Sequence, residues 1–297
     1  MTLDAAGEPE ASLAARSQLE KLQHGDGYQQ IWGQAYRLDV EHRLGRRSPT
    51  TVETLKHLVG TTPPLHNSDG PATVRRAGMF ELYAHSVEQA MSDDDRLDDH
   101  RAILAFQRGD RAAMARHARV VVERCERSPC SDWIRFSRWL AVLDSKTVDQ
   151  DLAVLERDYR SDKSALAYSG IVLASLDRWA EARTKLEAAR GAPHIWESQT
   201  DLTELDGWLG LARLRAGDVT GARVVFEEGL ATMSIWHNGF PGLGYMTPVI
   251  ELALADLLWA SDRERARRLA TRAVAGFTRL GRAVDRASAE RWLAQHR

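Results

Sequence analysis

Two stretches of this sequence, residues 165–190 and 204–230, carry small residues at the same spacing. Gly170 is followed twelve residues later by Ala182, and Gly210 is followed twelve residues later by Ala222. Gly217 and Asp218 interrupt the later stretch, as a turn between two helices does. The pattern therefore predicts that each stretch folds as two helices joined by a tight turn.

The apolar residues of the later stretch recur at three- and four-residue steps, which is the period of an amphipathic helix. The first helix has Leu205, Trp208, Leu209, Ala212 and Leu214, and the second has Ala222, Val225, Phe226 and Leu230. A large side chain at the crossing would push the helix axes beyond their usual separation of about 8–10 Å. We therefore predict that helix packing depends on Gly170, Ala182, Gly210, Ala222 and Phe226.

The arrangement resembles the tetratricopeptide repeat, a family of helix pairs with small residues at these places. The matching residues are Gly210, Gly217, Val219, Ala222, Phe226 and Gly229, and Gly170, Trp179, Ala182, Leu186 and Ala189 in the earlier copy. The resemblance implies an all-α solenoid of antiparallel helix hairpins. Gly170 and Gly210 are 40 residues apart, however, whereas the family period is about 34. A generic helical bundle, which also needs small residues where helices cross, is the alternative.

Weaker copies of the pattern continue along the chain. Helix pairs are expected at 102–107 and 111–126, at 133–143 and 148–159, and at 249–260 and 263–280, with a closing helix at 284–295. Further helices are expected at 9–23, 27–45, 49–59 and 72–91. Because residues 61–71 are rich in Pro and Gly, they predict a linker. The expected organisation is an N-terminal helical unit at 1–60, this linker, and the repeat array at 72–297.

Residues 266–297 also resemble the tail of helical-repeat regions that are attached to bacterial Ser/Thr kinases. This resemblance implies a role in bacterial signalling. The sequence has no glycine-rich phosphate loop, no His-Arg-Asp loop and no Asp-Phe-Gly, so the chain is not itself a kinase.

The composition favours a cytoplasmic protein without a nucleic-acid or membrane partner. The net charge of −2 gives no general attraction to polyanions. No run approaches the ~20 apolar residues of a membrane span, and the acidic N-terminus is no secretory signal. Two cysteines, Cys125 and Cys130, argue against a disulfide framework and are expected to be thiols.

Residues 234–248 and 191–196 are two expected loops that are rich in aromatic residues. Loops are normally polar, so these must be buried against the array or bind something else. Corresponding loops of a stacked array line one edge, which makes the two a joint candidate surface. The candidate partner-binding residues are Trp196, Trp236, His237, Asn238 and Tyr245.

Asp94, Asp95 and Asp98 match the DDxxD pattern that looks like the Mg²⁺–diphosphate motif of class I terpene synthases. Carboxylates one helical turn apart can share a hard cation. The second metal motif of that family is missing, and acidic residues also suit a helix N-terminus. An all-α, Mg²⁺-dependent enzyme is therefore the alternative function, and otherwise we expect no catalytic residue, metal or cofactor.

A positive excess marks the C-terminal part, from Arg263, Arg265, Arg267, Arg268, Arg272, Arg279, Arg282 and Arg286. This segment is either a docking site for an acidic partner or phosphate, or a solvated helix face. The array as a whole is expected to hold a peptide or helix of another protein on its concave face, as an adaptor or regulatory module. Self-association through the end helices is the third alternative, and the sequence leaves the oligomeric state open.

Overall fold

The computed structural model describes residues 97–127, 135–159, 164–191, 199–237 and 245–296, together with Arg37, Ala84, Val87 and Glu88. The chain divides into two compact units, residues 1–100 with 234–243, and residues 101–233 with 244–297. We call the second one the array unit. The expected helices at 9–23 and 49–59 and the linker at 61–71 lie outside the described residues. The domain boundaries proposed from the sequence therefore stay predictions.

The described residues form helices and no strand, which confirms the all-α class. The helices are α6 (Leu97–Arg108), α7 (Arg111–Arg127), α8 (Arg135–Ala141), α9 (Val148–Asp158), α10 (Ser164–Ser175), α11 (Trp179–Gly191), α12 (Gln199–Arg215), α13 (Val219–His237), α14 (Thr247–Leu258), α15 (Arg263–Leu280) and α16 (Ala283–Gln295), with a short 3₁₀ turn, η2 (Val142–Asp144), after α8. The helix pairs expected from residue 102 onward are all present, with ends shifted by a few residues.

Three of the hairpins, α6–α7, α10–α11 and α12–α13, are joined by the same turn. One or two residues after the end of the first helix, the chain has a residue with a left-handed backbone. The residue after it donates its N–H to the carbonyl five positions back, as in a Schellman motif. The left-handed residues are Gly109 (φ 76°), Asp177 (φ 59°) and Gly217 (φ 80°). The donors are Asp110, Arg178 and Asp218, each 2.9 Å from its acceptor. Since these turns are local, Gly217 and Asp218 alone were enough to predict the turn between α12 and α13.

The left-handed position in the α10–α11 turn gives a prediction about stability. Asp177 occupies a conformation that costs a non-glycine residue about 1 kcal/mol, and its carboxylate accepts an exposed hydrogen bond of 3.1 Å from Nε1 of Trp179. Because Asp177→Gly relieves the strain and loses this bond, it should stabilise the protein by about 0.5 kcal/mol. Gly217→Ala, at the corresponding position of the next hairpin, should destabilise it by about 1 kcal/mol. Urea denaturation of the two variants checks the pair, and a loss of stability in Asp177→Gly would contradict the turn assignment.

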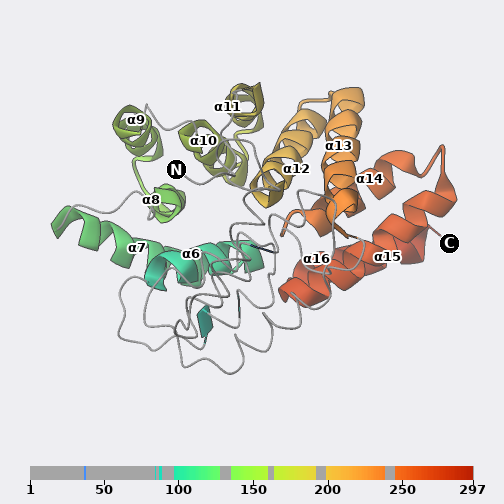
Figure 1. Ribbon diagram of the computed structural model, residues 1–297, viewed down its shortest axis with the longest axis horizontal. Helices are drawn as coiled ribbons and strands as arrows, with labels where there is room; N and C mark the ends of the chain where they lie inside the picture. The colour runs from blue at the N-terminus through green and yellow to red at the C-terminus, as the bar shows by residue number, and fades with distance from the viewer. Residues whose placement is uncertain are drawn as a thin grey trace. The chain divides into compact units, whose positions relative to one another are not determined.

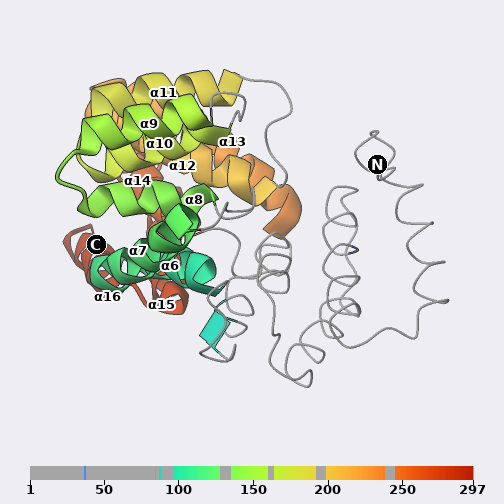
Figure 2. The ribbon, with the colours of Figure 1, turned by 90° about the vertical axis from the view of Figure 1, so that its left-hand side faces the viewer.

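Each hairpin also packs against its neighbour. The first helices follow one another, with α10 in contact with α8 and α12, and α12 in contact with α14. Helices α9, α10 and α11 lie side by side in both views of the ribbon (Figure 1, Figure 2). This neighbour-to-neighbour stacking is what distinguishes a solenoid from a closed bundle, so the predicted helical-repeat array is confirmed for the array unit.

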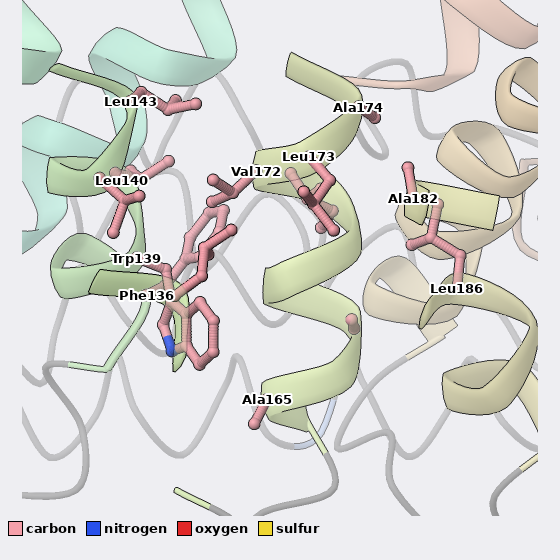
Figure 3. Close-up of a cluster of buried hydrophobic side chains, with 14 of the residues drawn as sticks. Phe136, Trp139, Leu140, Leu143, Ala165, Val172, Leu173, Ala174, Ala182 and Leu186 are labelled. Atoms are coloured by element: carbon pink, nitrogen blue, oxygen red, sulfur yellow. The ribbon is translucent and has the colours of Figure 1, made fainter. Parts of the chain in front are cut away.

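The core runs along the stack. Helix α10 is covered on one side by Phe136, Trp139 and Leu140 of α8, and on the other by Ala182 and Leu186 of α11 (Figure 3). A second buried cluster joins α13, α14 and α15 around Phe226 and Ile250. Because α10 has apolar contacts on two sides, its buried face is wider than the single stripe of a surface helix.

Small residues lie where the helices cross most closely. A Cβ atom added to Gly210 would lie 2.2 Å from Cε1 of Phe226, and one added to Gly170 would lie 2.6 Å from Cγ of Leu186. Ala182 and Ala222 are fully buried. The same close approach recurs between α15 and α14, where a Cβ on Gly276 would lie 2.8 Å from Cβ of Pro248. The backbones at these crossings therefore leave no room for a side chain.

The expected loop at 234–248 is partly wrong. Residues 234–237 continue α13 as helix, and α14 begins at Thr247, with Pro248 in its first turn. Proline favours the first turn of a helix because its missing N–H would have no partner there. The Gly and Pro residues of this segment made the predicted loop too long at both ends, and the two flanking helices too short. Residues 238–244 lie outside the described residues.

Candidate functional site

The first helices of successive hairpins line one cavity of about 280 Å³ in the array unit. Its lining includes Phe106 of α6, Met114 of α7, Leu143 of η2, Ser175 of α10, Trp208 and Leu211 of α12, and Met246 and Val249 at the start of α14. Arg282, in the turn between α15 and α16, also lines it. Both ends of the array unit thus reach the same cavity, which means that the stack curves and that the cavity lies on its inner side.

Aromatic side chains form one wall of this cavity. The indole Nε1 of Trp208 donates a hydrogen bond of 2.7 Å to the hydroxyl of Tyr245. The ring of Phe106 stacks on Trp208 at 6.2 Å and meets the edge of Tyr245 at 5.8 Å. Contacts of this kind fix ring orientation as well as burying apolar area. The wall is therefore preorganised, with Tyr245 itself only 2% exposed.

Two guanidinium groups add positive charge to the lining. Arg111 donates from Nη2 to the carbonyl oxygen of Leu143 at 2.7 Å. Arg282 donates from Nε to Asp285 at 2.7 Å and lies 5.6 Å above the ring of Phe277. Each anchor uses part of a five-donor group, so the cavity combines apolar walls with cationic donors at its margin.

The structure describes three of the five candidate binding residues, Tyr245, Trp236 and His237. Tyr245 lies in the cavity wall, buried and hydrogen-bonded to Trp208, which agrees with the self-packing alternative for that residue. Trp236 and His237 belong to the last turn of α13. Trp196 and Asn238 lie outside the described residues. The joint surface of two aromatic loops therefore stays a prediction.

Sequence reasoning missed the cavity residues Phe106 and Trp208. Trp208 was assigned to the core because of its helical spacing, and its side chain is half-buried with one edge on the cavity. The position of Trp208 on the first helix of a hairpin could have indicated the cavity, since first helices form the inner side of a curved stack. No local pattern indicated that Phe106, about a hundred residues earlier, would meet it.

The acidic motif is only partly visible. Asp98 lies in the first turn of α6 and is 8% exposed, whereas Asp94 and Asp95 lie outside the described residues. Asp98 is therefore a buried carboxyl group and not a solvated one. Within the described ranges, no three His, Cys, Asp or Glu side chains are grouped so that they could hold a metal ion.

The cysteine expectation was wrong for Cys125, which is disulfide-bonded. The only other cysteine of the sequence, Cys130, lies outside the described residues. The composition argument concerned frameworks of several bridges, and it does not bear on a single bridged cysteine.

Two carboxyl groups are buried between helices of the array unit. Glu251 of α14 pairs with Arg272 of α15 at 2.6 Å, and burial raises its pKa to about 7 against the opposing effect of Arg272 and Arg279. Asp206 of α12 pairs with Arg190 of α11 at 2.7 Å, and burial raises its pKa as well. Both link neighbouring helices, and neither residue lines the cavity.

None of the helices in the described part of the chain is long and apolar enough to span a bilayer. No family model matches the chain, and no curated protein matches it. Among solved structures, a Rap protein in complex with competence and sporulation factor is similar over 97% of this chain and 93% of that one, with 14% sequence identity and a TM-score of 0.47. At that identity and score the likeness says nothing about the function of this chain.

Proposed function

We propose that the array unit is a binding module that holds an apolar anchor of another protein's peptide or helix in the cavity on its inner side. The observation that carries this proposal is the aromatic and aliphatic cavity of about 280 Å³. Residues of α6, α7, η2, α10, α12 and α14 build it together. The protein would then work as an adaptor or regulator, and a place in bacterial signalling follows only from the resemblance to kinase-attached repeats.

The size of the cavity favours an anchor side chain over a whole small molecule. Pockets for drug-sized ligands are about 300–1,000 Å³, so this cavity lies just below their range. One or two large apolar side chains fill such a space. Buried aromatic and aliphatic anchors of this kind supply most of the affinity in protein interfaces.

The margin of the cavity favours a peptide over a purely apolar ligand. Arg111 and Arg282 are positioned by their bonds to Leu143 and Asp285, and their remaining N–H groups are suited to backbone carbonyls and carboxylates. A peptide offers a backbone carbonyl at every residue and carboxylates at its acidic residues and its C-terminus. The arrangement thus matches the usual plan of an interface, which has an apolar centre and a polar rim.

Blocking the cavity should abolish binding without unfolding the protein. Ser175 lines the cavity, and its hydroxyl donates to the carbonyl of Ile171, so Ser175→Phe would place a ring in the space of the anchor. Thr184 of α11 makes the same kind of bond to Ala180 and is exposed outside the cavity, which makes Thr184→Phe the matched control. We expect peptides selected from a displayed library to bind Ser175→Phe at least about tenfold more weakly, a loss of about 1.4 kcal/mol.

The measurement is the Kd of each selected peptide by fluorescence anisotropy, with circular dichroism to verify folding. Thr184→Phe should stay within about twofold of the unsubstituted protein. Selected peptides that bind both phenylalanine variants equally well, or a selection that enriches none, would refute the cavity as the binding site.

A further inference from the structure

A second hollow lies over the exposed side of α15 and shares no residue with the cavity on the inner side. Its volume is about 840 Å³, and its lining is Trp259, Arg263, Glu264, Arg267, Arg268, Thr271 and Arg272. We call it the arginine groove. The four arginines are exposed, so this segment of α15 presents its positive charge to solvent.

The lining of the arginine groove has four arginines and one acidic residue, Glu264. Ion pairs within the array unit neutralise only some of these arginines. Arg268 pairs with Glu264, and Arg272 pairs with the buried Glu251. The guanidinium of Arg263 lies 5.3 Å above the ring of Trp259. Within the described part of the chain, the side chain of Arg267 makes no ion pair. The groove therefore has a positive excess that the array unit does not neutralise.

The spacing of the arginines suits an extended acidic chain. Arg263 and Arg267 are four residues apart on the helix, and so are Arg268 and Arg272. Four residues of α-helix rise about 6 Å. Alternate side chains of an extended strand are about 6.6 Å apart. Carboxylates at every second position of a strand would thus meet successive arginines of one row.

Nucleic acid fits the arginine groove less well. The ring of Trp259 is already in contact with Trp292 at 5.6 Å and His296 at 4.7 Å, besides Arg263. A base would have no open aromatic platform on which to stack. The net charge of −2 also gives the whole chain no long-range attraction to a phosphate backbone.

From this geometry we infer that the arginine groove is a docking surface for an extended, acidic segment of a partner protein with Asp or Glu at alternate positions. The rows from Arg263 to Arg272 span about 14 Å of helix, which matches about four residues of extended chain. The acidic segment would displace the exposed Glu264 from Arg268 and add a carboxylate to Arg267. Charge-assisted bonds to arginine are stronger than neutral ones, and the hollow brings several of them together.

The test uses a fluorescein-labelled peptide of alternating Gly and Glu, and its Gly-Gln counterpart, with the full chain at low salt. The groove variant is Arg263→Gln with Arg267→Gln. Its matched control is Arg223→Gln with Arg291→Gln, which removes two exposed charges from α13 and α16. We expect the glutamate peptide to bind the unsubstituted chain, the groove variant to bind it about tenfold more weakly, and the control to change by less than about twofold.

Three results would overturn the inference. The control variant could lose as much affinity as the groove variant, labelled oligothymidylate could bind as tightly as the glutamate peptide, or the glutamate peptide could fail to bind at about 1 mM protein. Ser175→Phe should leave binding of the glutamate peptide unchanged, because that residue lies in the other cavity. The inference about the arginine groove therefore stands or falls separately from the proposed function.

Discussion

Gly210→Ala is expected to destabilise the array unit by about 2–3 kcal/mol, although alanine is the better helix former. The substitution gains about 1 kcal/mol of helix propensity. The added Cβ, however, would lie 2.2 Å from Cε1 and 2.5 Å from Cδ1 of Phe226, far inside van der Waals contact. Phe226 is fully buried, and protein interiors are close-packed, so its ring cannot shift freely. The helices α12 and α13 must therefore move apart, which disturbs both neighbouring hairpins.

Gly191→Ala is the matched control for Gly210→Ala, since a Cβ on Gly191, the last residue of α11, would meet nothing within 4 Å. Urea denaturation followed by circular dichroism should place this control within about 0.5 kcal/mol of the unsubstituted protein. If Gly210→Ala costs no more than Gly191→Ala, the helices do not cross as closely as described.

The double variant Gly210→Ala with Phe226→Ala tests which contact is responsible. Phe226→Ala alone should cost about 3–5 kcal/mol because it leaves a cavity. In that background the added Cβ at residue 210 has room, so the second substitution should cost nearly nothing. We expect a coupling energy of about 2 kcal/mol between the two positions. Additive losses would show that the damage comes from another contact.

The hairpins were predictable because their signals are local. Gly-Asp at 109–110 and at 217–218 is a left-handed stop followed by a helix cap, and both aspartates accept a hydrogen bond from the backbone three residues on. The apolar period then defines each helix. Asp177 takes the same left-handed conformation without glycine, and that turn was predicted from the apolar pattern around it.

The cavity was not predictable, because its residues meet only through the curvature of the whole stack. Phe106, Trp208 and Tyr245 come from three separate segments. Tyr245 looked like a residue of a binding loop because it follows Gly and Pro, but the indole of Trp208 provides the buried hydroxyl with its partner. The four arginines of the arginine groove, in contrast, all lie on α15, and their four-residue spacing is visible in the sequence.

Arg190→Met is expected to destabilise the array unit by about 3 kcal/mol at neutral pH. Arg190 of α11 donates from Nε to Asp206 of α12 at 2.7 Å and from Nη2 to Glu228 of α13 at 2.6 Å, so one side chain joins three helices. The side chain of Asp206 is only 2% exposed. Removing its partner leaves a buried carboxylate without a countercharge, which costs more than the pair itself contributes. Glu228→Gln removes the exposed partner of the same arginine, and it should cost less than about 1 kcal/mol.

The loss in Arg190→Met should also depend on pH, and the sign follows from Asp206. Burial already raises its pKa above the ordinary 3.8, while the hydrogen bond and charge of Arg190 oppose that rise. A carboxyl group with a raised pKa in the folded state stabilises the protein fully below its unfolded pKa, and this contribution is lost as the pH rises through the folded pKa. Without Arg190 the pKa of Asp206 rises further, so the variant should lose more stability near pH 7 than near pH 4.

Thermal unfolding at both pH values measures this pH dependence. Asp206→Asn, added in the Arg190→Met background, is the control that should remove it. An equal loss at both pH values would mean that Asp206 reaches water once Arg190 is gone, and that the three helices are held together by their apolar contacts alone.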